Sequence, residues 1–106
     1  MIEVAQQGVG TIQKLLNLFG HDAKRIRESL PGRRGLSALR VRDVLKERAM
    51  TTIALAARTT GLTVPTVTSA LQELQRLGVV KEMTSRQRNR QFLYLEYYRT
   101  LDEGVA

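Results

Sequence analysis

The chain has 106 residues, enough for one domain with a modest hydrophobic core. Apolar residues make up 42% and charged residues 25%, which argues against a disordered chain. No apolar run is long enough to span a bilayer, and the absence of cysteine excludes disulfides and thiolate chemistry. This composition, with a start that does not resemble a signal peptide, favours a cytoplasmic protein.

The charge balance is the most informative total. Lys and Arg number 17 against 10 Asp and Glu, a formal net charge of +7. A small basic domain attracts polyanions such as nucleic acid, acidic lipid or an acidic protein partner, unless the excess serves only solubility.

The N-terminal third is predicted to be helical. Apolar residues at helical spacing predict a first helix over residues 4–18, which Gly20 ends. Asp22 is expected to cap a second, short helix that ends at Pro31-Gly32. The next residues, to Gly35, are interpreted as a basic loop that contains Arg33 and Arg34.

A further helix is predicted from a cap at Ser37 to about Glu47. Its apolar stripe comprises Leu36, Leu39, Val41, Val44 and Leu45. Basic residues lie on or beside the opposite face, namely Arg40, Arg42, Lys46 and Arg48. The charge excess is therefore regional, although a solvated helix face would show the same pattern.

A helix-turn-helix is predicted next. A short helix over residues 52–58 is followed by a turn in which Gly61 takes a positive φ. Thr63 or Val64 caps the second helix, which carries Pro65 in its first turn and runs to about residue 77. Its buried stripe comprises Val64, Val67, Leu71, Leu74 and Leu77.

The hydrophobic period changes after Gly78. Residues 79–83 and 91–95 predict two strands of a hairpin, and a short helix over 96–103 closes the chain. The predicted fold is mainly α with a small β-hairpin: a winged helix-turn-helix over residues 36–106, preceded by N-terminal linker helices over 1–35.

The second helix of the pair is the candidate for reading DNA in the major groove. Its outward face offers Thr66, Ser69 and Gln72 to base edges, and Arg76 to a phosphate. The face has no cation in its first two turns and it carries Glu73, so a polar solvent face without DNA contact is the alternative.

The hairpin tip is the candidate wing. Arg86, Arg88 and Arg90 alternate, so on an extended strand they share one side and could contact phosphates or a narrow minor groove. The alternative is that these charges protect an exposed strand pair from aggregation.

The sequence contains no phosphate loop, paired carboxylate site or nucleophile motif, which indicates a non-enzyme without cofactor or metal. His21, the single histidine, is expected to be a cap or a surface residue. Phe92 and Tyr94 are expected to pack the hairpin onto the helices, and Tyr97 and Tyr98 to tether the last helix, rather than to stack on bases. Binding to an acidic membrane surface ranks last, because no helix pairs a strong apolar face with a clustered basic one.

One further pattern covers residues 52–67, Leu71, Leu74, 78–80, Glu82, Thr84, 86–90, 92–94, Tyr97-Tyr98 and Leu101. With these residues the chain resembles the C-terminal winged helix of Fic-family proteins. The resemblance implies the C-terminal part of such a protein, with duplex DNA, the Fic core of the same parent chain, or a second copy as partner. The family's His-Pro-Phe and Gly-Asn-Gly-Arg signatures are absent, so AMP transfer is not implied for this chain.

Overall fold

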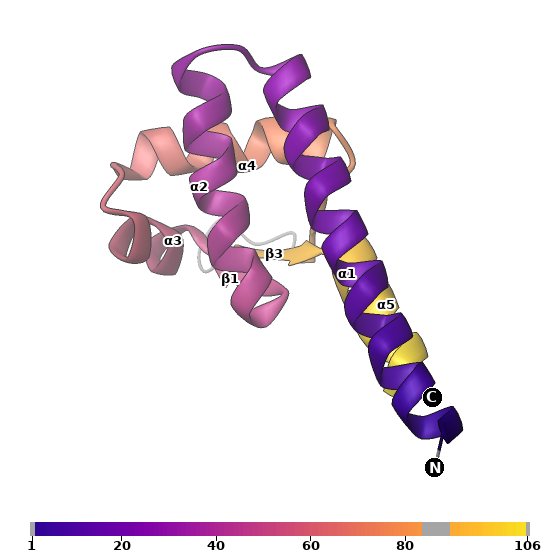
Figure 1. The fold of residues 1–106 in the computed structure, drawn as a ribbon. Helices are drawn as coiled ribbons and strands as arrows, with labels where there is room; N and C mark the ends of the chain where they lie inside the picture. The colour runs from indigo at the N-terminus through magenta and orange to yellow at the C-terminus, as the bar shows by residue number, and fades with distance from the viewer. Residues whose placement is uncertain (1, 84–89, 106) are drawn as a thin grey trace.

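The computed structural model describes residues 2–83 and 90–105, which form five helices and a three-stranded sheet (Figure 1). The elements in chain order are α1 (Ile2–Ser29), α2 (Arg33–Arg48), β1 (Met50–Thr52), α3 (Ile53–Thr60), α4 (Val64–Arg76), β2 (Val80–Glu82), β3 (Gln91–Tyr94) and α5 (Leu95–Val105). This order confirms the mainly helical winged helix-turn-helix predicted from the sequence, and it adds one strand.

The N-terminal segment is one long helix, so the predicted break at Gly20 is wrong. Gly20 is exposed within α1, where a glycine costs only about 1 kcal/mol relative to alanine. The helix continues because Phe19 on one side of the glycine and Ile26 on the other pack against the same core. Asp22 is therefore not a cap; its buried carboxylate accepts a hydrogen bond from the Tyr94 hydroxyl at 2.8 Å.

The turn between α1 and α2 is shorter than predicted. Arg33 and Arg34 form the first turn of α2 rather than a loop, and Ser37 lies inside that helix rather than at its cap. The chain reverses at Gly32, which has a φ of 75°. Gly35 then packs against the end of α1, where a Cβ would lie 2.0 Å from the Leu30 carbonyl oxygen. Only glycine permits this approach, and it lets α2 begin early.

The sheet is antiparallel with the order β1-β3-β2. The central strand β3 pairs Phe92 with Thr51 of β1 and with Glu82 of β2. Strand β1 was not predicted, because three residues between two helices are too few to show a period. Ala49, at a φ of 63°, ends α2, and its carbonyl oxygen accepts the Tyr94 N–H at 2.7 Å.

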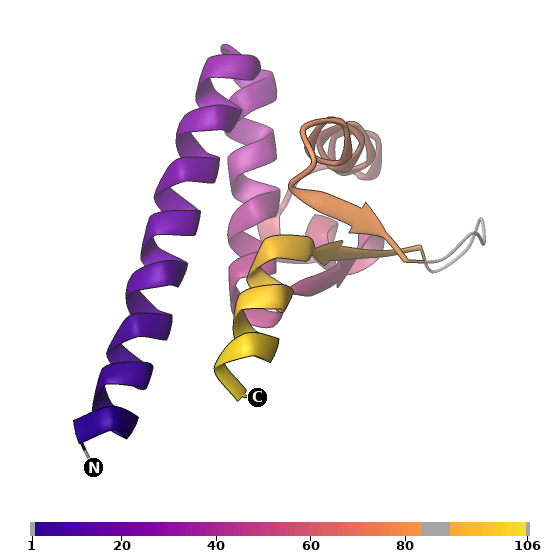
Figure 2. The same ribbon diagram turned by 90° about the vertical axis from the view of Figure 1, so that its right-hand side faces the viewer.

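The core lies where α2, α4 and the sheet meet, and α1 covers α2 from the other side (Figures 1 and 2). The predicted boundary after residue 35 falls inside α2, and α1 contributes Ile26 and Leu30 to this core. Two predicted stripe residues are instead largely exposed: Leu36 at 64% and Val64 at 54%. Both lie in the first turns of their helices, on a side that is open to solvent.

Inside the molecule, the side chain of Arg42 links α2 to α1. Arg42, expected on the solvent side of α2, is buried; it donates to the Phe19 carbonyl oxygen at 2.8 Å and pairs with Asp43 at 3.2 Å. The expectation was wrong because α1 packs against α2 where Arg42 lies and supplies the carbonyl oxygen that this side chain bonds. Phe19 also packs on Tyr97 edge to face, with ring centroids 5.1 Å apart.

Candidate nucleic-acid interface

Local signals organise the helix pair α3–α4. Thr52, predicted as the first residue of the short helix, instead caps α3 by accepting the Leu55 N–H at 3.2 Å. Gly61 takes the left-handed conformation, with a φ of 76°, and its N–H donates to the Ala57 carbonyl oxygen. Thr63 then caps α4. The helix-turn-helix and its glycine turn are thereby confirmed.

Helix α4 has one buried face and one open face. Val67, Leu71 and Leu74 are fully buried, as predicted. The open face carries exposed Ser69 and Gln72, with Thr66 partly covered. Thr66 is positioned by its neighbour, because the Thr63 hydroxyl donates to the Thr66 hydroxyl oxygen at 2.8 Å. The three predicted base-edge residues therefore lie together on the open face of α4.

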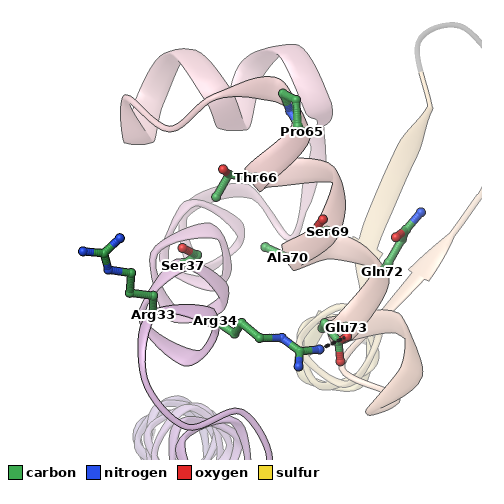
Figure 3. Close-up of a pocket in the computed structure, with 9 residues that line it drawn as sticks. All are labelled: Arg33, Arg34, Ser37, Pro65, Thr66, Ser69, Ala70, Gln72 and Glu73. Atoms are coloured by element: carbon green, nitrogen blue, oxygen red, sulfur yellow. Dashed lines mark hydrogen bonds and ion pairs between the residues drawn. The ribbon is translucent and has the colours of Figure 1, made fainter.

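A groove of about 550 Å³ runs between this face and the N-terminal turns of α2 (Figure 3). Residues of α4 line one side of it, and Arg33, Arg34 and Ser37 of α2 line the other. These three α2 residues were not among the predicted site residues, because Arg33 and Arg34 were expected in a loop. The regional excess of basic residues was the signal in the sequence that could have pointed to the two arginines.

Glu73 lies in the groove between two arginines. Its Oε1 accepts from Arg34 Nη2 at 2.5 Å, and its Oε2 accepts from Arg76 Nε and Nη2 at 3.0 and 2.6 Å. The hydrogen bond from Arg76, supported by that from Arg34, lowers the pKa of Glu73 against the opposing effect of desolvation. Glu73 is therefore ionised at neutral pH, and Arg76, predicted to contact phosphate, is held in an ion pair.

The wing begins with β2 and β3. In Figure 2 this hairpin and α4 both lie on the side of α2 that faces away from α1. Arg86 and Arg88 lie outside the described residues. Arg90 forms a bidentate pair with Glu82, at 2.7 and 2.9 Å, and lies over the Phe92 ring at 5.3 Å. It therefore links the two strands at the base of the wing.

The remaining expectations concern residues away from this face. His21, expected to be either a cap or a surface residue, is exposed. Phe92 and Tyr94 are buried, which confirms their packing role, and Tyr97 contacts Phe19, but Tyr98 is half exposed. Over residues 2–83 and 90–105, no group of His, Asp or Glu is arranged to hold a metal, and no helix is long and apolar enough to cross a membrane.

The fold defined by these elements is a winged helix-turn-helix. No protein-family model matches the chain, and no curated protein sequence matches it. Among solved structures, the chain is similar to a MarR family protein from Bacillus stearothermophilus, with 18% identity and a TM-score of 0.48 over 94% of this chain and 73% of that one. The resemblance to Fic-family proteins finds no support in these comparisons.

Proposed function

We propose that this chain binds duplex DNA as a regulatory module, with α4 in the major groove. The observation that carries the proposal is the open face of α4, where Thr66, Ser69 and Gln72 share one groove with the arginines that begin α2. Hydroxyl and amide side chains bond base edges, and arginines contact phosphates. At 13 residues, α4 is about 20 Å long, and the B-DNA major groove, about 12 Å wide, admits an α-helix.

The base contacts are assigned to the polar side chains of α4. Gln72 can bond an adenine through its N6 and N7 positions, because the amide offers both an acceptor and donors. Thr66 accepts from Thr63, so its own O–H stays free to donate within the described structure. Ser69 lies between them on the exposed side of the helix. Each lost base contact should cost about 1 to 3 kcal/mol of discrimination.

The phosphate contacts are assigned to cations around this face. Arg33 is exposed and makes no ion pair with any residue that the structure describes, so its guanidinium is available to a phosphate. Arg86 and Arg88 are included on the sequence alone. Arg90 as a phosphate contact stays a prediction, and in the free chain Glu82 holds it.

A mobility-shift titration against mixed duplex DNA at several salt concentrations tests the proposal. If about four to six phosphates are neutralised, log K should fall with log salt at a slope of roughly −4 to −5. Arg33→Ala should reduce that slope by about 1. Arg48→Ala removes the same charge at the other end of α2 and should leave the slope nearly unchanged.

A second variant separates base reading from charge. Gln72→Ala should alter the order of preference among duplexes while leaving the salt slope unchanged, because it removes no charge. Affinity that does not respond to salt would exclude DNA as the partner. Equal slopes for the two arginine variants would exclude the groove as the site of contact.

A second candidate function is association with another copy of the chain. Ile12 and Leu16 are each about 60% exposed, and because they are four residues apart they lie on one side of α1. Exposed apolar side chains also occur on α5, which packs beside α1, at Tyr98 and Leu101. Sedimentation over a wide concentration range should show a dimer, and a strict monomer throughout would reject this role. Association would be compatible with DNA binding.

A further inference from the structure

We propose that Glu73 is a specificity-determining residue of this interface, because it holds two arginines away from phosphate and so restrains sequence-independent binding. The inference rests on the proposed DNA-binding function. Placing α4 in the major groove does not decide how binding is divided between contacts that read bases and contacts that only neutralise phosphate charge. The inference concerns this division.

The geometry of the carboxylate carries the inference. Each Glu73 oxygen serves a different arginine, so the residue bridges Arg34 of α2 and Arg76 of its own helix. The Glu73 side chain is only 22% exposed, whereas both arginines are more than 60% exposed. The acid is therefore more buried than the two guanidinium groups that it pairs with, and Figure 3 shows Arg34 of α2 reaching Glu73 of α4.

A phosphate that approaches this groove competes with Glu73 for the same N–H groups. The carboxylate is ionised at neutral pH, since the hydrogen bond from Arg76 lowers its pKa. It therefore repels the phosphate while it occupies the donors that would bind it. Arginine contacts to phosphate carry no sequence information, so occupying them raises the relative weight of the base contacts made by Ser69 and Gln72. In this way a negative charge increases discrimination at the cost of overall affinity.

The test compares Glu73→Gln with the wild-type chain in salt titrations on several unrelated duplexes. The amide removes the negative charge and should release one or both arginines to phosphate. The slope of log K against log salt should then steepen by about 1 to 2, so that raising salt from 50 to 200 mM costs about 4 to 16 times more affinity than in wild type. Affinities for different duplexes should also become more alike.

A matched control separates this effect from net charge. Glu96→Gln on α5 also removes one carboxylate that pairs with an arginine three residues later, Arg99, at 2.8 Å. It lies outside the groove and should leave slope and discrimination at wild-type values. Adding Arg34→Ala and Arg76→Ala to the Glu73→Gln chain should remove the gained slope, and circular dichroism checks that each variant is folded.

The outcomes distinguish the inference from the function on which it rests. If the wild type binds DNA and Glu73→Gln has the same slope and the same preferences, the inference is wrong and the DNA-binding proposal stands. If Glu96→Gln steepens the salt slope as much as Glu73→Gln does, the effect is one of net charge alone, and the inference is also overturned. Absence of DNA binding by both chains at low salt overturns both proposals. Should Glu73→Gln fail to fold, Glu73→Asp keeps the charge but shortens the bridge, and an unchanged slope there would contradict the inference.

Discussion

The buried pair between Tyr94 and Asp22 sets how the sheet is held against α1, and its removal has a calculable effect. The Tyr94 side chain is fully buried and donates to Asp22 Oδ2 at 2.8 Å, across 72 residues of sequence. Burial, reinforced by this hydrogen bond, raises the pKa of the Tyr94 hydroxyl above its usual range, so the group remains a donor at neutral pH. The other contact of the carboxylate is a longer one, to Arg25 at 3.4 Å.

Tyr94→Phe should therefore lower the free energy of unfolding by about 2 to 3 kcal/mol. A hydrogen bond to a charged group contributes roughly 1.5 to 3 kcal/mol, and its loss leaves a buried carboxylate oxygen without its partner. For a domain of about 100 residues, a loss of that size lowers Tm by on the order of 10 °C. Urea unfolding and thermal melts both measure it.

Two further variants make this prediction refutable. Tyr98→Phe removes the same hydroxyl from a half-exposed ring on α5 and should change stability by less than about 0.5 kcal/mol. Combining Tyr94→Phe with Asp22→Asn should show a coupling energy of about 1 kcal/mol or more, because the two groups contact each other. If Tyr94→Phe is as stable as Tyr98→Phe, the pair does not hold β3 to α1 and the reasoning fails.

Two other predictions concern local structure. Gly35→Ala should destabilise the chain by about 1 to 3 kcal/mol, because its Cβ would meet the Leu30 carbonyl oxygen. Gly20→Ala, in open space on α1, should stabilise the chain by about 0.5 to 1 kcal/mol. Urea unfolding midpoints measure both changes, and a change of the same sign in the two variants would contradict the assigned packing. The hydrogen bonds from Arg90 lower the pKa of Glu82 from 4.5, so the ion pair contributes stability above that value and loses it as pH falls through the lowered pKa. Glu82→Gln should therefore unfold with a shallower dependence on pH below about 4.5, and an unchanged acid limb in thermal melts would show that the pair contributes nothing.

Part of the candidate site followed from local rules. The glycine turn at Gly61, the cap at Thr63 and the proline in the first turn of α4 depend on backbone conformations set by a few neighbouring residues. The buried stripe of α4 follows from the helical period, which also places Ser69 and Gln72 on the opposite side. These features could be predicted because each depends on residues that lie within about one or two helical turns of each other.

Other parts depended on residues distant in sequence. Strand β1 forms because β3 pairs with it, some 40 residues later, although three residues alone show no strand period. Arg42 is buried because α1 covers it, and a wheel drawn for α2 alone cannot show that neighbour. Glu73 meets Arg34 across 39 residues.

The sequence by itself determined the helix pair α3–α4 with its glycine turn, the strands β2 and β3, and which side of α4 is apolar, because backbone propensity and hydrophobic period act locally. Only the tertiary structure decided that α1 continues through Gly20 and that the arginines at the start of α2 border α4. Both features depend on which apolar surfaces pack together and are thereby removed from water. These surfaces belong to segments far apart in the chain, so no local sequence pattern specifies which of them pack.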